Sequence, residues 1–128
     1  MKLLVDTHAL IWFLAGDRRL PPRARVEIEA AGQGALVSAV SAMEVVTKHR
    51  LGKLPEAEVL ARRFEASVRA HGFGGLPISL AHAELAGRLE IPHKDPFDRL
   101  LIAQSLIEGI PLVSNEVIFD RAGVSRIW

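Results

Sequence analysis

Five short apolar segments alternate with longer segments of helical periodicity along the chain. Each short segment is rich in Leu, Val, Ile or Ala and is followed closely by polar residues or glycine, which is typical of strands buried in a sheet. The third segment contains Pro77, and proline favours a place at the edge of a sheet. The predicted strands are residues 3–5, 35–38, 76–79, 110–114 and 124–128.

The longer segments carry the start and stop signals of α-helices. Proline stands at the start of the second, at Pro21 and Pro22, and glycine follows the end of others, as at Gly16 and Gly52. The glycine-rich residues 72–75 are expected to form a loop. The predicted helices are residues 7–15, 21–32, 39–51, 56–71, 80–89 and 95–108. Strands that alternate with helices predict an α/β fold with a parallel sheet and helices on both faces. The length of 128 residues fits a single domain over residues 1–128.

Acidic residues recur where predicted strands end or predicted helices begin. Asp6 follows the first strand, and Glu116 follows the fourth. Glu44 lies in the apolar first half of the third helix, and Asp95 and Asp98 open the sixth. A charged carboxylate among apolar neighbours, such as that of Glu44, needs a hydrogen-bond partner, an ion-pair partner or a metal ion. Glu116 by itself is better explained as a solvated loop acid.

The other four acids also have structural alternatives. Asp6 suits the N-cap of the helix that follows it. Asp95 and Asp98 resemble a capping box and also favour the positive end of the helix dipole. Glu44 has Lys48 four residues further on, at the spacing of a helical ion pair.

Taken as a set, these acids favour a metal site. The carboxyl ends of parallel strands meet at one edge of the sheet, where such folds bind ligands. Carboxylates gathered there repel one another unless cations neutralise them, and hard divalent ions such as Mg²⁺ or Mn²⁺ prefer oxygen ligands. One or two such ions lower the pKa of water and stabilise charge on a phosphodiester. We expect the hydroxyls of Thr7 and Ser114 to assist by holding a water on the metal.

Composition narrows the chemistry further. The chain has no cysteine, which excludes disulfides, thiolate zinc sites and cysteine nucleophiles. The net charge of +1 offers no strong basic field, but the charge outside the five acids is positive, as suits a polyanion. With 5% aromatic residues, no base-stacking platform is evident. The possible phosphate contacts, with ordinary solvated surface as the alternative for each, are Lys48, Arg50, Lys53, Lys94 and Arg99.

The first predicted helix is apolar nearly all round. Trp12 and Phe13 lie in it, and part of this apolar surface is expected to join the core. The remainder exceeds what one sheet face can bury, which suggests a subunit or partner interface. No segment is long and apolar enough to span a bilayer, and no leader peptide is visible. We therefore expect a protein of the cytoplasm with no membrane association.

Four segments in order resemble the motifs of the PIN-domain family, in particular the VapC type of toxin ribonuclease from type II toxin–antitoxin systems. Residues 3–12 (LLVDTHALIW) resemble the first motif, and residues 37–44 (VSAVSAME) with residues 50–54 resemble the second. Residues 93–104 (HKDPFDRLLIAQ) resemble the third, and residues 112–116 (LVSNE) through residue 128 resemble the ending. The resemblance covers essentially the whole chain.

The resemblance implies a PIN-like three-layer fold with five parallel strands and a metal-dependent endoribonuclease that requires Mg²⁺ or Mn²⁺. It also implies a homodimer and a small cognate antitoxin that covers the site. By carry-over, Asp6, Glu44 and Asp98 are the catalytic residues and core metal ligands. Glu116 stands where the family usually has Asp, so it is expected to act through water or at a second metal. Asp95 ranks below Asp98 as a ligand because it also suits the helix cap.

Three other functions remain open from the sequence. A phospho-receiver domain has similar length and architecture, but the chain lacks an acceptor Asp after a middle strand and a Lys after a later one. A PIN-like module that binds RNA or a protein partner without cleaving is the main alternative. A DNA nuclease with the same chemistry is the third.

Overall fold

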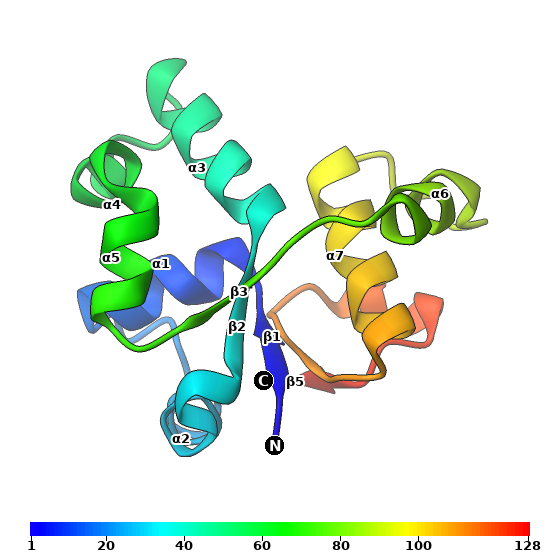
Figure 1. Cartoon of the computed structure of the whole chain (residues 1–128), viewed down its shortest axis with the longest axis horizontal. Coiled ribbons are helices and arrows are strands. Elements are labelled where there is room, and N and C mark those ends of the chain that lie inside the picture. The colour runs from blue at the N-terminus through cyan, green and yellow to red at the C-terminus, as the bar shows by residue number, and fades with distance from the viewer.

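The structure, a computed structural model, describes residues 1–128 and contains one sheet of five parallel strands (Figure 1). The strands are β1 (Leu3–Val5), β2 (Ala35–Ser38), β3 (Gly74–Leu76), β4 (Leu112–Val113) and β5 (Arg126–Ile127). Their order in the sheet is β3-β2-β1-β4-β5. The chain therefore builds outward from β1 to one side and then returns to build on the other. The reversal places a topological switch point between the carboxyl ends of β1 and β4, where open α/β sheets bind ligands.

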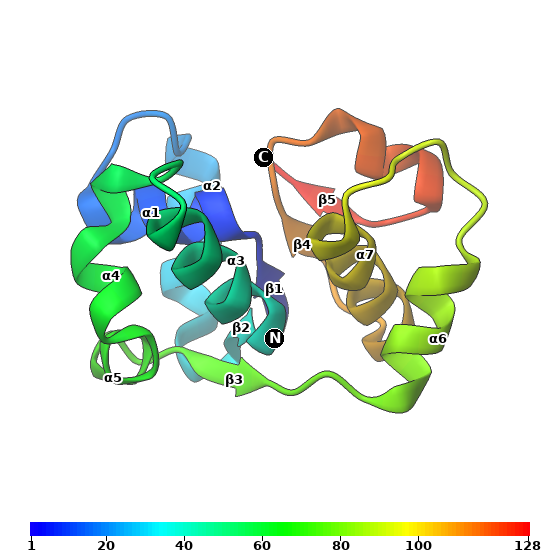
Figure 2. The ribbon, with the colours of Figure 1, turned by 90° about the horizontal axis from the view of Figure 1, so that it is seen from above.

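Helices cover both faces of this sheet, which confirms the predicted three-layer architecture (Figure 2). The α-helices are α1 (Thr7–Ala15), α2 (Pro22–Ala31), α3 (Ala39–Arg50), α4 (Glu58–Arg62), α5 (Phe64–Ala70), α6 (Leu80–Arg88) and α7 (Pro96–Glu108). Three short 3₁₀ segments are η1 (Gly32–Gly34), η2 (Pro55–Ala57) and η3 (Val117–Ala122). No helix combines the length and the apolar composition needed to cross a bilayer.

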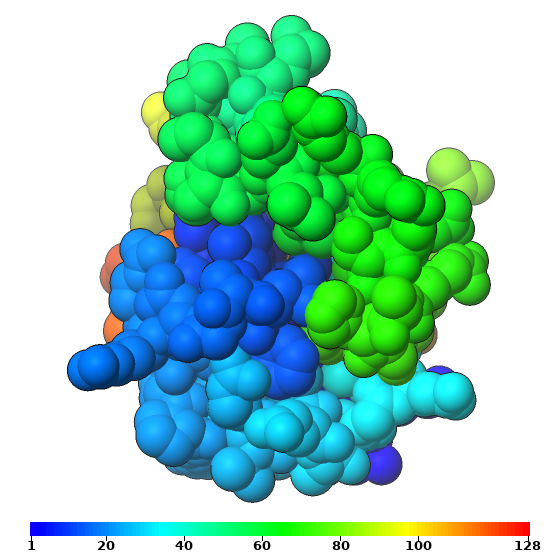
Figure 3. Space-filling model, turned by 90° about the vertical axis from the view of Figure 1, so that its left-hand side faces the viewer, coloured from blue at the N-terminus to red at the C-terminus, as the bar shows by residue number.

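The three residues of β1 divide the interior into two cores, because successive side chains of a strand point to opposite faces. Leu3 and Val5 pack with α1, α2, α4 and α5 on one face. Leu4 packs with Val40 at the start of α3, with α7 and with η3 on the other. Figure 3 shows α1 on the surface between α2 and the segment formed by α4 and α5, so these elements bury only part of the first helix.

The third strand lies two residues earlier than predicted, at Gly74–Leu76, and part of the expected loop 72–75 is therefore strand. β3 pairs with β2 at the sheet edge, as Pro77 suggested, but Pro77 follows the strand. Gly74 is required at this register, since an added Cβ would lie 2.8 Å from Leu36 Cδ2 and 3.0 Å from the Gln33 carbonyl oxygen. The close approach of two backbones explains why glycine, usually a loop signal, sits in a strand.

The single helix predicted over residues 56–71 is wrong. The segment consists of η2, α4 and α5, and the backbone at Arg63 is not helical, with φ −144° and ψ 57°. Leu60 and Val68 nevertheless both reach the same core. The change of direction at Arg63 allows α4 to pack against α3 while α5 follows the curved surface of the core.

Candidate active site

Asp6 stands at the switch point, directly after β1. It occupies the N-cap position of α1, but its side chain makes no capping hydrogen bond. The carboxylate instead accepts a hydrogen bond from the Ser114 hydroxyl, which reaches Asp6 Oδ2 at 2.6 Å from the end of β4. Asp6 is only 4% exposed, and burial raises its pKa from 3.8 to about 6. The capping alternative for Asp6 is therefore excluded, and a carboxylate is left in a site that disfavours its charge.

Glu44 reaches the same region from α3 and is 3% exposed. Its Oε1 accepts a hydrogen bond of 2.6 Å from the Thr7 hydroxyl, at the first position of α1. Its Oε2 pairs with the Lys48 ammonium at 2.5 Å. The helical ion pair considered from the sequence thus forms, but around a buried carboxylate rather than on a solvated helix face. Breaking such a pair leaves an uncompensated buried charge.

Asp95 and Asp98 separate into different roles at the start of α7. Asp95 caps the helix, and its Oδ1 accepts hydrogen bonds from the backbone N–H groups of Phe97 and Asp98. Asp98 accepts a hydrogen bond of 2.6 Å from His93 Nε2. Burial, together with the charges of Asp6, Asp95 and Glu44, raises the pKa of Asp98 to about 6, against the opposing effect of His93.

Three of the predicted acids share one electrostatic environment. The charge of Glu44 raises the pKa of Asp6, and the charges of Asp6 and Glu44 both raise that of Asp98. Lys48 responds in the opposite sense: burial lowers its pKa, but its hydrogen bond to Glu44 and the charges of Glu44, Asp95 and Asp98 raise it above the usual value. The ammonium of Lys48 thus lies within the negative field, and its nitrogen is 5.7 Å from the centre of the Phe97 ring.

The donor set fits a hard divalent cation by its chemistry. It consists of carboxylate oxygens, and burial, followed by the charges of neighbouring acids, raises the pKa of Asp6 and Asp98 to about 6. In the arrangement described, no three of the His, Asp and Glu side chains converge closely enough to form a ready metal site. Each oxygen of Glu44 accepts one hydrogen bond, from Thr7 or from Lys48, and keeps a second lone pair that can ligate a metal ion.

Glu116 is not brought into this group. Its backbone N–H donates to the Ser114 hydroxyl at 3.0 Å, but its carboxylate makes no hydrogen bond and no ion pair. The hydroxyls of Ser114 and Thr7 were expected to hold a water. Both donate to carboxylates, Ser114 to Asp6 and Thr7 to Glu44, and their contact with a water stays a prediction.

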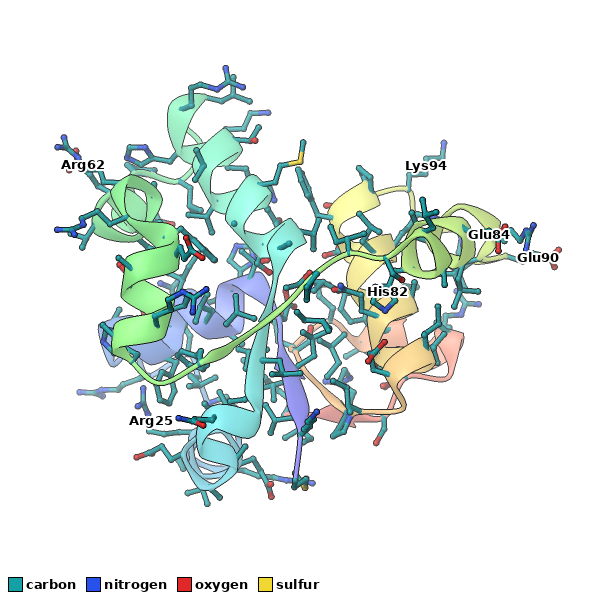
Figure 4. All side chains as sticks on the ribbon, in the orientation of Figure 1. Arg25, Arg62, His82, Glu84, Glu90 and Lys94 are labelled. Atoms are coloured by element: carbon teal, nitrogen blue, oxygen red, sulfur yellow. The ribbon has the colours of Figure 1, made fainter.

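The basic residues predicted to contact phosphates lie in different surroundings in the structure. Lys48 lies in the acidic group, whereas Arg50 and Lys53 are exposed at the end of α3. Lys94 is exposed and points away from the body of the molecule (Figure 4). Arg99 does not fit a phosphate contact, because its guanidinium donates to four backbone carbonyls that follow or end α6. These are the carbonyl oxygens of Ala86, Leu89, Ile91 and His93.

Sequence reasoning did not assign His93 to the site. Its ring bonds Asp98 and packs edge-on against Phe119, with centroids 6.2 Å apart. The Arg99 guanidinium binds the carbonyl of His93 itself at 2.8 Å and so holds this part of the loop against α7. The available signal was position: a histidine shortly before a helix whose first turn carries an acid can fold back onto that acid.

Comparisons with known proteins agree with this fold. The family model of the PIN domain matches residues 3–124. A toxin–antitoxin complex from Klebsiella pneumoniae contains a chain of similar fold, with a TM-score of 0.69 and 21% identity over 99% of this chain and 97% of that one.

Two further solved structures share the fold. One is a DNA-bound VapBC from Salmonella typhimurium, with a TM-score of 0.71 and 17% identity over 99% of this chain and 97% of that one. The other is FitAcB from Neisseria gonorrhoeae, with a TM-score of 0.67 and 19% identity over 98% and 96%. A search of curated proteins found no match.

The family model matches nearly the whole chain, and the parallel five-stranded sheet with acids at its switch point agrees with that match. The chain belongs to the PIN domain family.

Proposed function

We propose that this protein is a metal-dependent endoribonuclease and the toxin of a toxin–antitoxin pair. The observation that carries the proposal is the burial of Asp6 and Glu44, which are 4% and 3% exposed, at the switch point, where burial and their mutual charges raise the pKa of Asp6 and Asp98 to about 6. Unneutralised carboxylates at a functional edge are the environment that a divalent ion stabilises. Phosphodiester hydrolysis is the chemistry for which such carboxylate sites are suited.

Asp6, Glu44 and Asp98 would hold the Mg²⁺ or Mn²⁺ ion, with Asp95 and Glu116 ranked below them. When bound, the ion supplies charge stabilisation for the phosphodiester and lowers the pKa of water. Ser114 and Thr7 orient two of the carboxylates, and His93 orients the third. Asp95 contributes chiefly by capping α7, which fixes the turn that presents Asp98.

Lys48 is the basic residue best placed to contact a phosphate of the RNA. Its ammonium lies in the acidic group and is only partly exposed, with 29% of its side chain accessible. With a divalent ion neutralising Glu44, the Lys48 ammonium would be available to bind a phosphate oxygen. Arg50, Lys53 and Lys94 are exposed and would attract the RNA backbone at longer range.

The descriptions of similar solved structures support a proposal about the binding partners of this chain. Structures of similar fold are described as VapBC and toxin–antitoxin complexes. We propose that this chain likewise binds a cognate antitoxin, forms a homodimer and acts on RNA in the cytoplasm. The half-buried apolar residues of α1, among them Phe13 and Leu14, offer surface for such contacts.

The decisive experiment incubates the purified protein with structured RNA and with single-stranded DNA, in Mn²⁺ or in EDTA. We expect Mn²⁺-dependent cleavage of RNA, abolished by Asp6→Asn and by Asp98→Asn. Glu116→Gln is the matched control, since it removes an acid at the same sheet edge that has no partner in the site, and it should retain part of the activity. Cleavage that persists in EDTA or in Asp6→Asn would contradict the proposal.

One observation favours a second candidate, a PIN-like module that binds RNA or a partner without cleaving. Glu44 has both oxygens engaged, and no ready metal site is formed. If Lys48 stays paired with Glu44, its ammonium neutralises one of the three carboxylates and repels a divalent ion, which weakens metal binding. RNA binding without cleavage in Mn²⁺ would support this candidate.

A further inference from the structure

The two tryptophans of the chain meet at one surface, although they lie near opposite ends of the sequence. Trp12 comes from α1 and Trp128 follows β5, and their ring centroids are 5.9 Å apart at an angle of 54°. His8 lies one turn before Trp12, and the centroids of these two rings are 5.8 Å apart. The Arg19 guanidinium lies over the Trp12 ring, 4.9 Å from its centroid.

This aromatic surface, defined as His8, Trp12, Arg19 and Trp128, remains accessible. His8 and Arg19 are exposed, and both tryptophans are half-buried against the core. Asp17 binds Arg19 through both carboxylate oxygens and so holds the guanidinium against the ring. Because Arg19 covers one face of Trp12, the planes on which a base can stack are the paired guanidinium of Arg19, the exposed ring of His8 and the half-buried ring of Trp128.

The aromatic surface adjoins the acidic group. His8 is two residues beyond Asp6, in the first turn of α1. Trp128 follows β5, which pairs with β4, and Ser114 at the end of β4 holds Asp6. Figure 2 shows the C-terminus between α1 and β5.

We propose that this surface binds an unpaired nucleobase of the RNA strand next to the phosphodiester that the acids cleave. The inference rests on the proposed function, and it adds a base-binding site that the 5% aromatic content did not suggest. Single-stranded RNA is recognised mainly by stacking of splayed bases on aromatic and guanidinium planes. Acids that act on the backbone and rings that hold a base next to it would together fix the position of the strand.

The two tryptophans of the chain serve as fluorescent probes of this site. Both tryptophans lie in the aromatic surface, so the intrinsic tryptophan fluorescence reports on it alone. We expect a short single-stranded RNA, titrated in EDTA so that it is not cleaved, to change this fluorescence with the same Kd that anisotropy of a labelled RNA gives. An RNA that carries a single abasic position at the bound nucleotide should bind more weakly than the intact RNA.

Variants separate stacking from general charge effects. His8→Ala and Trp12→Leu should raise the Kd for RNA by roughly tenfold, as expected for loss of one stacked base. Trp128→Phe should keep most of the affinity, because an aromatic ring remains. Arg18→Ala is the matched control: it removes a neighbouring exposed charge that makes no ion pair, and it should leave Kd nearly unchanged. Thermal unfolding checks that Trp12→Leu is folded, and exposed His8 provides an independent variant.

The outcomes distinguish this inference from the proposed function. Fluorescence that stays constant while RNA binds and is cleaved would overturn the aromatic surface and leave the nuclease intact. A change in fluorescence on RNA binding without cleavage in Mn²⁺ would support the aromatic surface and contradict the nuclease. A fluorescence change that depends on protein concentration in the absence of RNA, with no response to RNA, would assign the surface to contacts between copies of the chain and overturn the inference.

Discussion

Each core acid at the carboxyl edge of the sheet is held by a neighbour that donates a hydrogen bond to it. Ser114 donates to Asp6, Thr7 to Glu44, and His93 to Asp98. These donors come from three different parts of the chain, so the site is oriented by tertiary structure rather than by one local motif. Partners that orient a metal ligand commonly affect metal affinity almost as strongly as the ligands themselves.

His93 offers the clearest test of this orientation. We predict that His93→Ala weakens Mn²⁺ binding by roughly 10- to 100-fold, because Asp98 loses the donor that fixes its carboxylate. His93→Gln should restore part of the affinity, since an amide can also donate. Mn²⁺ titration followed by electron paramagnetic resonance measures this without any RNA.

His71→Ala is the control for the loss of an imidazole. His71 is exposed and bonds only the Ser67 carbonyl of its own helix, so its removal should not alter Mn²⁺ affinity. Equal affinities for His93→Ala and the wild type would show that Asp98 needs no orienting partner.

The acids could be chosen from the sequence, but their partners could not. Position after an apolar triplet marks Asp6, and the apolar half of a helix marks Glu44. Neither pattern says that Ser114 reaches Asp6 from the fourth strand, since that contact depends on β4 lying beside β1. The Glu44–Lys48 pair was considered as an alternative to a catalytic role, whereas the structure shows the pair inside the acidic group.

At the level of elements, the edge strand β3 depends on one glycine. We predict that Gly74→Ala destabilises the protein by about 1–3 kcal/mol, because the new Cβ would meet Leu36 and the Gln33 carbonyl oxygen. Gly75→Ala is the matched control in the same strand, where an added Cβ meets nothing within 4 Å. Its effect should stay within about 0.5 kcal/mol.

Chemical denaturation of the two variants measures the difference in the free energy of unfolding. Similar losses in both variants would mean that glycine matters here through backbone flexibility in general rather than through the contact at Gly74.

Element ranges were predictable wherever the apolar pattern was local. The helices from Thr7, Ala39 and Leu80 begin where predicted, because each follows a strand or a capping residue. The break at Arg63 was not predictable, since neither glycine nor proline marks it and the bend follows the packing of α4 on α3. The earlier start of β3 was missed because Gly74 and Gly75 read as loop residues until their neighbour β2 is known.

For the whole molecule, the acidic site opposes the stability of the fold. Asp6 is buried at the end of the central strand, and its pKa is raised from 3.8 to about 6. Between these values the folded state binds more protons than the unfolded state, so stability falls as the pH rises from about 4 to about 6. For Asp6 alone this amounts to at most roughly 3 kcal/mol, since each pKa unit corresponds to about 1.4 kcal/mol. A site that destabilises the metal-free fold above pH 6 is expected to gain stability from a cation.

We therefore predict that Mn²⁺ raises the Tm strongly at pH 7 and weakly at pH 5, because below pH 6 Asp6 and Asp98 must first release protons to bind it. In EDTA, Asp6→Asn should raise the Tm at pH 7 and reduce the loss of stability between pH 4 and pH 6. The same substitution should abolish the response to Mn²⁺, while Glu116→Gln keeps both the pH dependence and the response.

Thermal unfolding at pH 4, 5, 6 and 7, with and without Mn²⁺, measures these effects. A Tm that responds equally to Mn²⁺ at pH 5 and pH 7 would mean that the ion binds away from these acids. A different result would be that Asp6→Asn stabilises the protein while the wild type shows no response to Mn²⁺. The acids would then be neutralised by Lys48 and not by a metal ion.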